Sequence, residues 1–225
     1  MAVSARATAP ARPRRGGGPV ALALLVAGAL GIAIGIGLAL LHSPASSSVT
    51  APALHGEATW AAGARPAPAI ASLRDQSGRA FSLAALRGHT VVIAFLDSHC
   101  TAACPLEGRA LAAAEQTLPA AQRPVLVAVS VNPLDTPASA RAAARKWGLA
   151  GLGAWHWLMG SRRALARVWA AYRILVQIPA HGDIVHTEAL YLLDRHGDER
   201  SGYLYPFMPQ FVRGDLALLS GGRSV

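Results

Sequence analysis

The sequence predicts an α/β domain that follows an N-terminal transmembrane helix. Two observations indicate this. From about residue 70 onward, segments with strand patterns alternate with segments with helix patterns, which is the order of an α/β domain. Before them, about 22 uncharged and mostly apolar residues run from Val20 to Leu41. A chain of 225 residues has room for one globular domain and such an appendage.

The apolar run has the length and the flanks of a membrane anchor. As a helix rising 1.5 Å per residue it would reach roughly 33 Å, enough to cross the hydrocarbon core of a bilayer. Residues 1–42 carry four arginines, all before the run, and no acidic residue, which favours a cytoplasmic N-terminus. We therefore predict a basic cytoplasmic N-terminus (1–18), a single-pass transmembrane anchor (19–41) and a domain outside the cytoplasmic membrane.

A cleaved signal peptide is the alternative interpretation of the same run. Such a peptide has an apolar region of about 7 to 15 residues and a small-residue cleavage site. The run here is longer, and "LHSPASSS" after it matches a cleavage site poorly. No cysteine directly follows it to carry a lipid. We favour the uncleaved anchor. The composition, rich in alanine and arginine, is typical of a high-GC bacterial genome, so we expect the membrane to be bacterial.

Residues 42–69 are rich in proline, serine and alanine and lack periodicity, which predicts a tether between anchor and domain. His42 and His55 are expected to be solvated in it, with weak adventitious metal binding as the alternative. The extracytoplasmic domain is predicted at 70–225. The net charge is +9, but beyond the N-terminal arginines there are 17 basic and 12 acidic residues and no basic run, so no nucleic-acid partner is expected.

The elements of the domain follow from local patterns. Continuous β-branched and aromatic runs predict strands that are covered on both faces. Pro105 suits the first turn of a helix, where its missing N–H costs nothing. Another helix is expected to be capped by Asp135 or Thr136 and to stop at Gly148. In chain order we predict a hairpin turning at Asp75–Gly78, a strand at 89–97, a helix at 105–118, a strand at 123–131, helices at 135–149 and 161–172, a hairpin at 188–205 and a helix at 209–219.

Cys100 and Cys104 are the only cysteines, and three residues separate them instead of the two of a C-x-x-C motif. They lie between the carboxyl end of a predicted central strand and the start of a helix, which is where sites tend to lie in open α/β sheets. The helix dipole and free N–H groups there favour thiolate over thiol. This position favours a chemical role.

Three roles fit the cysteine pair. A structural disulfide is disfavoured because closing a loop of about five residues removes little entropy from the unfolded chain. A dithiol–disulfide redox pair needs a cysteine at a helix start and a second within reach, and both are present. A metal site would select Cu(I) or zinc through soft sulfur, and Cu(II) would need a harder third donor such as imidazole.

The choice among these roles depends on a histidine. His99 follows the same strand and is expected to point away from the interior of the loop. His156 is expected to be packed or partly exposed. His181 and His186 precede a predicted strand, but spacing alone does not bring either to the cysteines. Asp97 is expected to fix the loop.

At this point the sequence resembles the Sco/SenC family of thioredoxin-fold copper proteins, which serve cytochrome c oxidase assembly. The resemblance covers the chain from about Leu73 to Leu219, nearly the whole predicted domain. Four segments carry it in order: "LRDQSGRAFSLAALRGHTVVIAFLDSHC", "CTAACPL" with its C-x-x-x-C-P pattern, "VSVNPLDTP" and "VHTEALYLLDRHG".

The resemblance implies a thioredoxin-like fold and a copper site for Cu(I) or Cu(II). Carried over residue by residue, it makes Cys100 and Cys104 the thiolate ligands and His186 the imidazole ligand. Many members have aspartate directly before the histidine, where this chain has Val185. Asp183 or Glu188 is the expected substitute that orients the imidazole.

The function implied is that of a membrane-anchored extracytoplasmic copper chaperone, a metallochaperone more than an enzyme. Its expected partners are cytochrome c oxidase subunit II or another cuproenzyme, together with an upstream copper donor or thiol reductant. The alternative is a thiol–disulfide oxidoreductase that acts on partner cysteines through Cys100 and Cys104. A peroxidase of the peroxiredoxin type is disfavoured because Thr101 follows Cys100 instead of preceding it.

Overall fold

The computed structural model describes residues 53–221. The predicted cytoplasmic N-terminus and transmembrane anchor, together spanning 1–41, lie outside this range and stay predictions. Within 53–221, no helix has the length and apolar character needed to cross a membrane.

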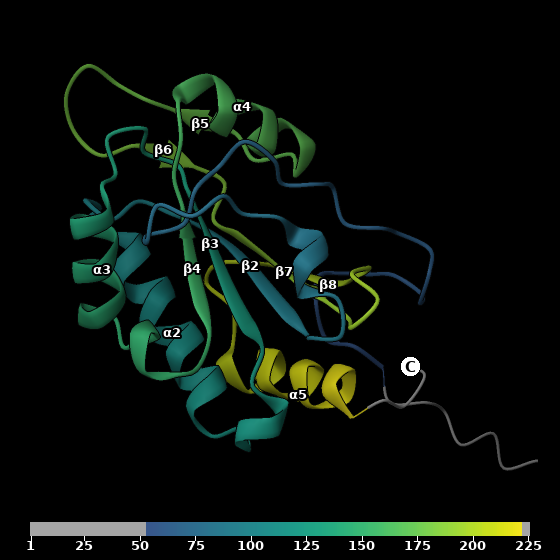
Figure 1. The fold of residues 1–225 in the computed structure, drawn as a ribbon. Helices are drawn as coiled ribbons and strands as arrows, with labels where there is room; N and C mark the ends of the chain where they lie inside the picture. Colours follow the sequence, from purple (N-terminus) through teal and green to yellow (C-terminus); the bar gives the residue numbers. More distant parts are fainter. Residues whose placement is uncertain (1–52, 222–225) are drawn as a thin grey trace, which may run out of the picture. The chain divides into compact units, whose positions relative to one another are not determined.

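A six-stranded sheet forms the centre of the domain, in the order β1-β8-β7-β2-β3-β4 (Figure 1). Strands β2, β3 and β4 are parallel, while β7, β8 and β1 add antiparallel pairs on the other side of β2. Every residue of β2 and β3 is buried, as their continuous apolar sequence predicts. The bounds are β1 Ala58–Thr59, β2 Val91–Leu96, β3 Val125–Ser130, β4 Trp155–Leu158, β7 Ala189–Leu193 and β8 Glu199–Leu204.

Helices cover both faces of the sheet, and their starts agree with the predicted capping. Thr136 caps α3 through a reciprocal capping box with Ser139, so the first of the two predicted cap candidates, Asp135, is not the cap. Ser161 caps α4 by accepting from the Ala164 N–H. The bounds are α2 Ala103–Gln116, α3 Pro137–Lys146, α4 Arg162–Ala171 and α5 Pro209–Ser220, with short 3-10 helices η1 Leu83–Leu86, η2 Ala120–Gln122 and η3 Leu149–Gly151.

The sheet separates two hydrophobic clusters. On one face α2, α3 and α5 contribute residues such as Leu111, Ala144 and Leu216. On the other face α4 contributes residues such as Leu165 and Trp169. The 3-10 helix η1 adds Leu83 and Leu86 to this second cluster, and α4 is the one α-helix that packs on it among the described residues.

A small two-stranded ribbon stands apart from the main sheet. It pairs β5 (Val176–Gln177) with β6 (Val185–His186) in antiparallel register, with Val176 opposite His186. The Thr187 N–H donates to the Leu175 carbonyl at 2.9 Å and extends the pairing by one bond. The ribbon thus carries one of the predicted ligands.

The structure differs from the predictions at the Asp75–Gly78 turn and at strand β4. Around Asp75–Gly78 the chain makes the expected turn, but only a single bridge from Arg74 to Ala80 closes it, so no hairpin forms. Strand β4 was not predicted. Its four residues, "WHWL", lack the β-branched run that marked β2 and β3 and are too few to show a strand period, and parallel pairing with β3 makes them a strand.

The predicted tether at 42–69 is attached to the domain in its second half. Strand β1 pairs with β8, and the Trp60 N–H donates to the Arg200 carbonyl at 3.0 Å. His55 is not the freely solvated residue that we expected. Its Nδ1 lies 2.8 Å from Oδ1 of the buried Asp215, and its ring stacks on Phe211 with centroids 5.1 Å apart.

Candidate metal centre

The cysteine loop leaves the carboxyl end of β2 and enters α2, as the sequence predicts. Asp97 fixes the loop, which confirms its expected role. Its carboxylate accepts from the His99 N–H at 2.9 Å and from the Asn132 side chain at 3.0 Å. The Asp97 carbonyl accepts from the Cys100 N–H at 3.1 Å. These bonds hold the chain in a compact turn that presents Cys100.

Both cysteines are free thiols, and they meet at the first turn of α2. The Cys104 N–H donates to Cys100 Sγ at 3.4 Å, so the sulfur takes up one of the backbone donors that a helix start leaves without an intrahelical partner. Pro105 follows and has no N–H to satisfy. Cys100 is partly exposed, whereas Cys104 is completely buried.

Burial changes what the helix start does for Cys104. Removal from water raises the pKa of its thiol, and the nearby Cys100 and Glu107 raise it further. The predicted preference for thiolate at this position therefore does not hold for Cys104. The sequence reasoning counted the helix dipole but had no measure of desolvation, which is the larger effect at a fully buried sulfur.

His186 lies beside this sulfur. Its Nε2 is 3.6 Å from Cys104 Sγ, and its Nδ1 is 3.1 Å from the Thr187 carbonyl. A carbonyl oxygen only accepts, so Nδ1 carries the proton and the Nε2 lone pair faces the sulfur. This is the tautomer that a metal ligand needs. The carboxylate expected to orient the ring, Asp183 or Glu188, is replaced in this role by a backbone carbonyl.

The donor set fits a soft ion. Two sulfurs and one imidazole are the ligands that copper or zinc selects. Donors bound to one such ion at roughly 2.0–2.3 Å lie about 3–4 Å apart, and the Cys104–His186 separation falls in this range. The donor atoms of Cys100, Cys104 and His186 do not all lie within 4.8 Å of one another. Among the residues described, the donor atoms of Asp97, His99 and Asp135 do.

The Asp97–His99–Asp135 group is a hydrogen-bonded network that supports the loop. Asp135 accepts from Ser98 Oγ at 2.5 Å, Ser130 Oγ at 2.6 Å and Trp157 Nε1 at 3.2 Å, and His99 Nδ1 lies 3.1 Å from it. Burial raises the pKa of Asp135 although these bonds oppose the rise. Its lone pairs are thus occupied by protein donors.

Glu107 was missed by the sequence reasoning. It lies on α2, three residues after Cys104, and is buried with no hydrogen-bond partner for either carboxyl oxygen. Burial and the neighbouring Glu188 raise its pKa well above the ordinary value. A signal was present, because Glu107 shares its helix stripe with the apolar Leu111 four residues on.

Both the sequence and the fold of the domain have known relatives. The SCO1/SenC family model matches residues 71–216. No curated protein sequence matches the chain. Among solved structures, Bradyrhizobium japonicum ScoI with copper bound is 25% identical, with a TM-score of 0.57, covering 68% of this chain and 99% of that one.

Two further structures share the fold. Arabidopsis thaliana ScoI with copper bound is 19% identical, with a TM-score of 0.60, covering 70% of this chain and 99% of that one. BsSco, described with a disulfide switch and as a member of the Sco family of cytochrome c oxidase assembly proteins, is 19% identical, with a TM-score of 0.59, covering 71% and 95%. These structures have the thioredoxin-like fold that the resemblance implied. The family match spans well over half of the sequence, and we conclude that the chain belongs to the SCO1/SenC family.

Proposed function

We propose that the chain is a membrane-anchored copper chaperone whose domain works outside the cytoplasmic membrane. Its cargo is copper, held by Cys100, Cys104 and His186. It supplies this copper to the binuclear copper site of cytochrome c oxidase subunit II or to another cuproenzyme. Membership of the SCO1/SenC family and the copper bound in related structures support this function.

One observation carries the proposal. Cys104 Sγ and His186 Nε2 lie 3.6 Å apart, and the Thr187 carbonyl holds the imidazole in the tautomer whose free lone pair faces the sulfur. A dithiol that only exchanged disulfides would need no imidazole here. The partial exposure of Cys100 also suits a chaperone, because cargo leaves by ligand exchange with a partner and one ligand must be within the partner's reach.

Copper loading and cysteine oxidation should exclude one another. Oxidation removes two protons and two electrons from the Cys100 and Cys104 thiols and joins the sulfurs, so that neither thiolate remains to bind the ion. An upstream thiol reductant reverses this by supplying two electrons and two protons, and an upstream copper donor can then load the site.

Thiol–disulfide exchange with a partner is the second candidate. The contact of the Cys104 N–H with Cys100 Sγ favours it, because both sulfurs lie at one helix turn and both are free thiols. In this reaction the partner disulfide gains the two electrons and two protons that the Cys100–Cys104 pair loses. The buried Cys104 would be the resolving thiol and the more exposed Cys100 the attacking one.

The decisive experiment is an anaerobic copper titration of the reduced domain, residues 43–225, and of two variants. His186→Ala removes the proposed ligand, and His181→Ala is the matched control because that histidine is exposed on the preceding loop. We expect one tight equivalent in the wild type and in the control, with thiolate-to-copper charge transfer for Cu(II), and much weaker binding in His186→Ala. Binding that is indifferent to His186, or that has no stoichiometry, would overturn the copper proposal and favour thiol exchange.

A further inference from the structure

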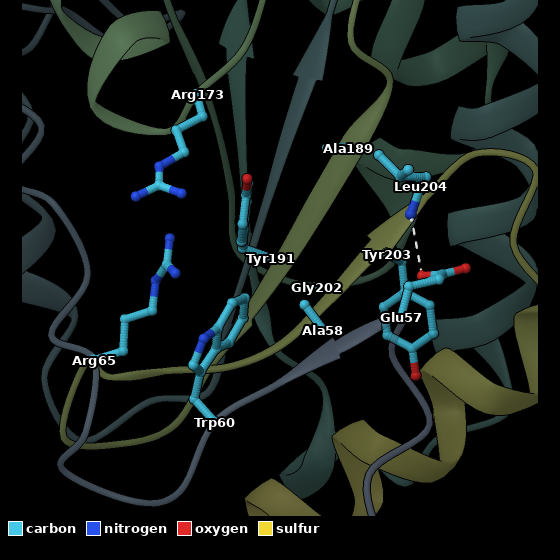
Figure 2. A pocket seen from close by; sticks show the side chains of 10 residues that line it. All are labelled: Glu57, Ala58, Trp60, Arg65, Arg173, Ala189, Tyr191, Gly202, Tyr203 and Leu204. Atoms are coloured by element: carbon cyan, nitrogen blue, oxygen red, sulfur yellow. Dashed lines mark hydrogen bonds between the residues drawn. The ribbon is translucent and has the colours of Figure 1, made fainter.

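A cleft opens on the sheet face opposite α2, away from the cysteine loop. It has a volume of about 280 Å³ and lies over the β1–β8–β7 side of the sheet (Figure 2). Ala58, Gly202 and Tyr191 form its floor, since they pair across three neighbouring strands and share one face. The cleft is present because α4 does not extend over this part of the sheet.

Apolar and aromatic residues line the floor of the cleft. Gly202 has no side chain, and a Cβ there would lie 3.2 Å from Trp60 Cη2 and 3.7 Å from Tyr191 Cδ1. The two rings therefore lie close above the backbone of Gly202, and a bound group has to pack against their exposed surfaces. Trp60 and Tyr191 are both partly exposed, and the Tyr191 hydroxyl is fixed by donation to the Tyr172 carbonyl at 2.9 Å.

Arg65 supplies one charged wall. Its guanidinium lies over the Trp60 ring, 4.3 Å from the centroid, and its Nε forms an ion pair with the buried Glu199. The stacking and the ion pair together fix the plane of the guanidinium. Its terminal nitrogens point into the cleft, toward Arg173 (Figure 2).

Arg173 supplies the opposite wall from an unusual backbone position. It follows the end of α4 with a φ of 59°. The Ile174 N–H donates to the Trp169 carbonyl and the Arg173 N–H to the Ala170 carbonyl, which is the Schellman pattern. Glycine is the usual residue at this left-handed position, because a Cβ is disfavoured there. The helix end by itself would favour glycine at position 173, so it does not explain why this residue is an arginine.

The two guanidiniums face one another, and the ion pair between Arg65 and Glu199 does not neutralise both positive charges. Glu199 is the carboxyl that both act on, and burial raises its pKa against the lowering effect of Arg65 and then Arg173. Within residues 53–221 the Arg173 side chain has no hydrogen bond or ion pair to an acceptor, whereas Arg65 already has Glu199. Facing cations over an apolar floor are the arrangement that binds an oxyanion through paired N–H donors.

We propose that this cleft binds an organic oxyanion, a carboxylate or phosphate ester joined to a flat apolar group. Arg65 and Arg173 hold the oxyanion, and the apolar group packs against the exposed parts of Trp60 and Tyr191. Glu57 at the far end of the cleft disfavours a second negative group on the ligand. This site is separate from the proposed copper site, and its test does not use copper.

The test is isothermal titration calorimetry of the full chain, purified in detergent, with four probes: benzoate, phenyl phosphate, inorganic phosphate and the neutral benzamide. We expect benzoate or phenyl phosphate to bind with a stoichiometry near one, and benzamide and inorganic phosphate to bind at least about 10-fold more weakly. Whichever of the first two binds identifies the oxyanion. Equal binding of benzamide removes the role of the arginines, and equal binding of inorganic phosphate removes that of the apolar floor; either result overturns the proposal.

Variants of Arg173 separate ligand binding from folding. Arg173→Gly suits the left-handed position, so the protein should become more stable to urea while probe affinity falls about 10- to 100-fold. Arg173→Asn, which also tolerates a positive φ, should lose the same affinity. Arg167→Gln is the control, because it removes the same charge from an exposed position on α4 and should leave affinity unchanged. Unchanged binding in both Arg173 variants would contradict the proposal.

Discussion

Cys104 Sγ and His186 Nε2 lie 3.6 Å apart although 82 positions separate the two residues along the chain. Because the proposed copper site needs His186 and disulfide formation does not, the single variant His186→Ala distinguishes copper binding from thiol–disulfide exchange. In His186→Ala the thiols and the helix start stay in place, so the cysteines should still form a disulfide. We expect the dithiol midpoint potential, measured by alkylation in glutathione buffers, to stay within about 30 mV of the wild type.

A larger shift would mean that the imidazole tunes the redox pair and is more than a metal donor. His181→Ala again serves as the control, since a histidine on the exposed loop should leave both the potential and copper binding unchanged. A His186→Ala protein that loses copper and keeps its potential separates the chaperone from the oxidoreductase.

The two thiols should differ strongly in reactivity. Cys100 is partly exposed, whereas Cys104 is completely buried and burial raises the pKa of its thiol. Both effects slow attack on an alkylating reagent, which needs an accessible thiolate. In the reduced protein at neutral pH, iodoacetamide should label Cys100 at least about 10-fold faster than Cys104, as peptide mass spectrometry would measure. Equal labelling rates would contradict the burial of Cys104.

Glu115 should make stability depend on pH. Burial raises its pKa from 4.5 to about 8, against the lowering effect of Arg123. A carboxyl whose pKa is raised by folding stabilises the protein fully below pH 4.5, and this contribution is lost as the pH rises toward 8. The loss is at most about 1.4 kcal/mol per pH unit. Urea unfolding from pH 5 to 8 should therefore show a steeper decline in the wild type than in Glu115→Gln, and equal slopes would contradict this assignment.

Two glycines in helices should respond to alanine in opposite ways. A Cβ at Gly108 on α2 would lie 2.9 Å from Trp147 Cε3, whereas at Gly214 on α5 it would lie 3.6 Å from His55 Cε1. Gly108→Ala should cost about 1–3 kcal/mol of unfolding free energy, more than the gain in helix propensity of about 1 kcal/mol. Gly214→Ala should raise the free energy of unfolding, and so stabilise the protein, by roughly 0.5–1 kcal/mol. Urea titrations of both variants would measure the difference in sign.

Local sequence pattern predicts the central strands and helices of this fold, because their residue types favour the same secondary structure that the fold gives them. Strands β2 and β3 are buried at every residue and rich in β-branched residues, and α3 and α4 begin at residues whose side chains cap them. Strands β1 and β4 lack such a pattern and depend on their partners. Residues 53–69 are rich in proline and alanine and acquire structure from β8 and from Asp215, which lies 160 positions from His55. No local rule contains that information.

The candidate site divides in the same way. Position at a strand end and a helix start made Cys100 and Cys104 candidate site residues, and the family resemblance added His186 as a candidate ligand. The orienting group was predicted as a carboxylate but is the Thr187 carbonyl, because the backbone of β6 is held against β5. The buried Glu107 and the cleft between Arg65 and Arg173 involve packing across the sheet, which spacing along one chain does not describe.

The ribbon that carries His186 has a consequence for kinetics. It shares no strand with the main sheet and rests on two residue pairs, while Cys104 lies at the start of a helix that packs on the core. Short, partly exposed elements open at a lower free energy than the whole fold. Amide hydrogens of β5 and β6 should exchange long before those of β2. Under the proposed copper function, opening of the ribbon would detach the imidazole from the ion, and the opening rate would limit how fast a partner that reaches Cys100 receives it.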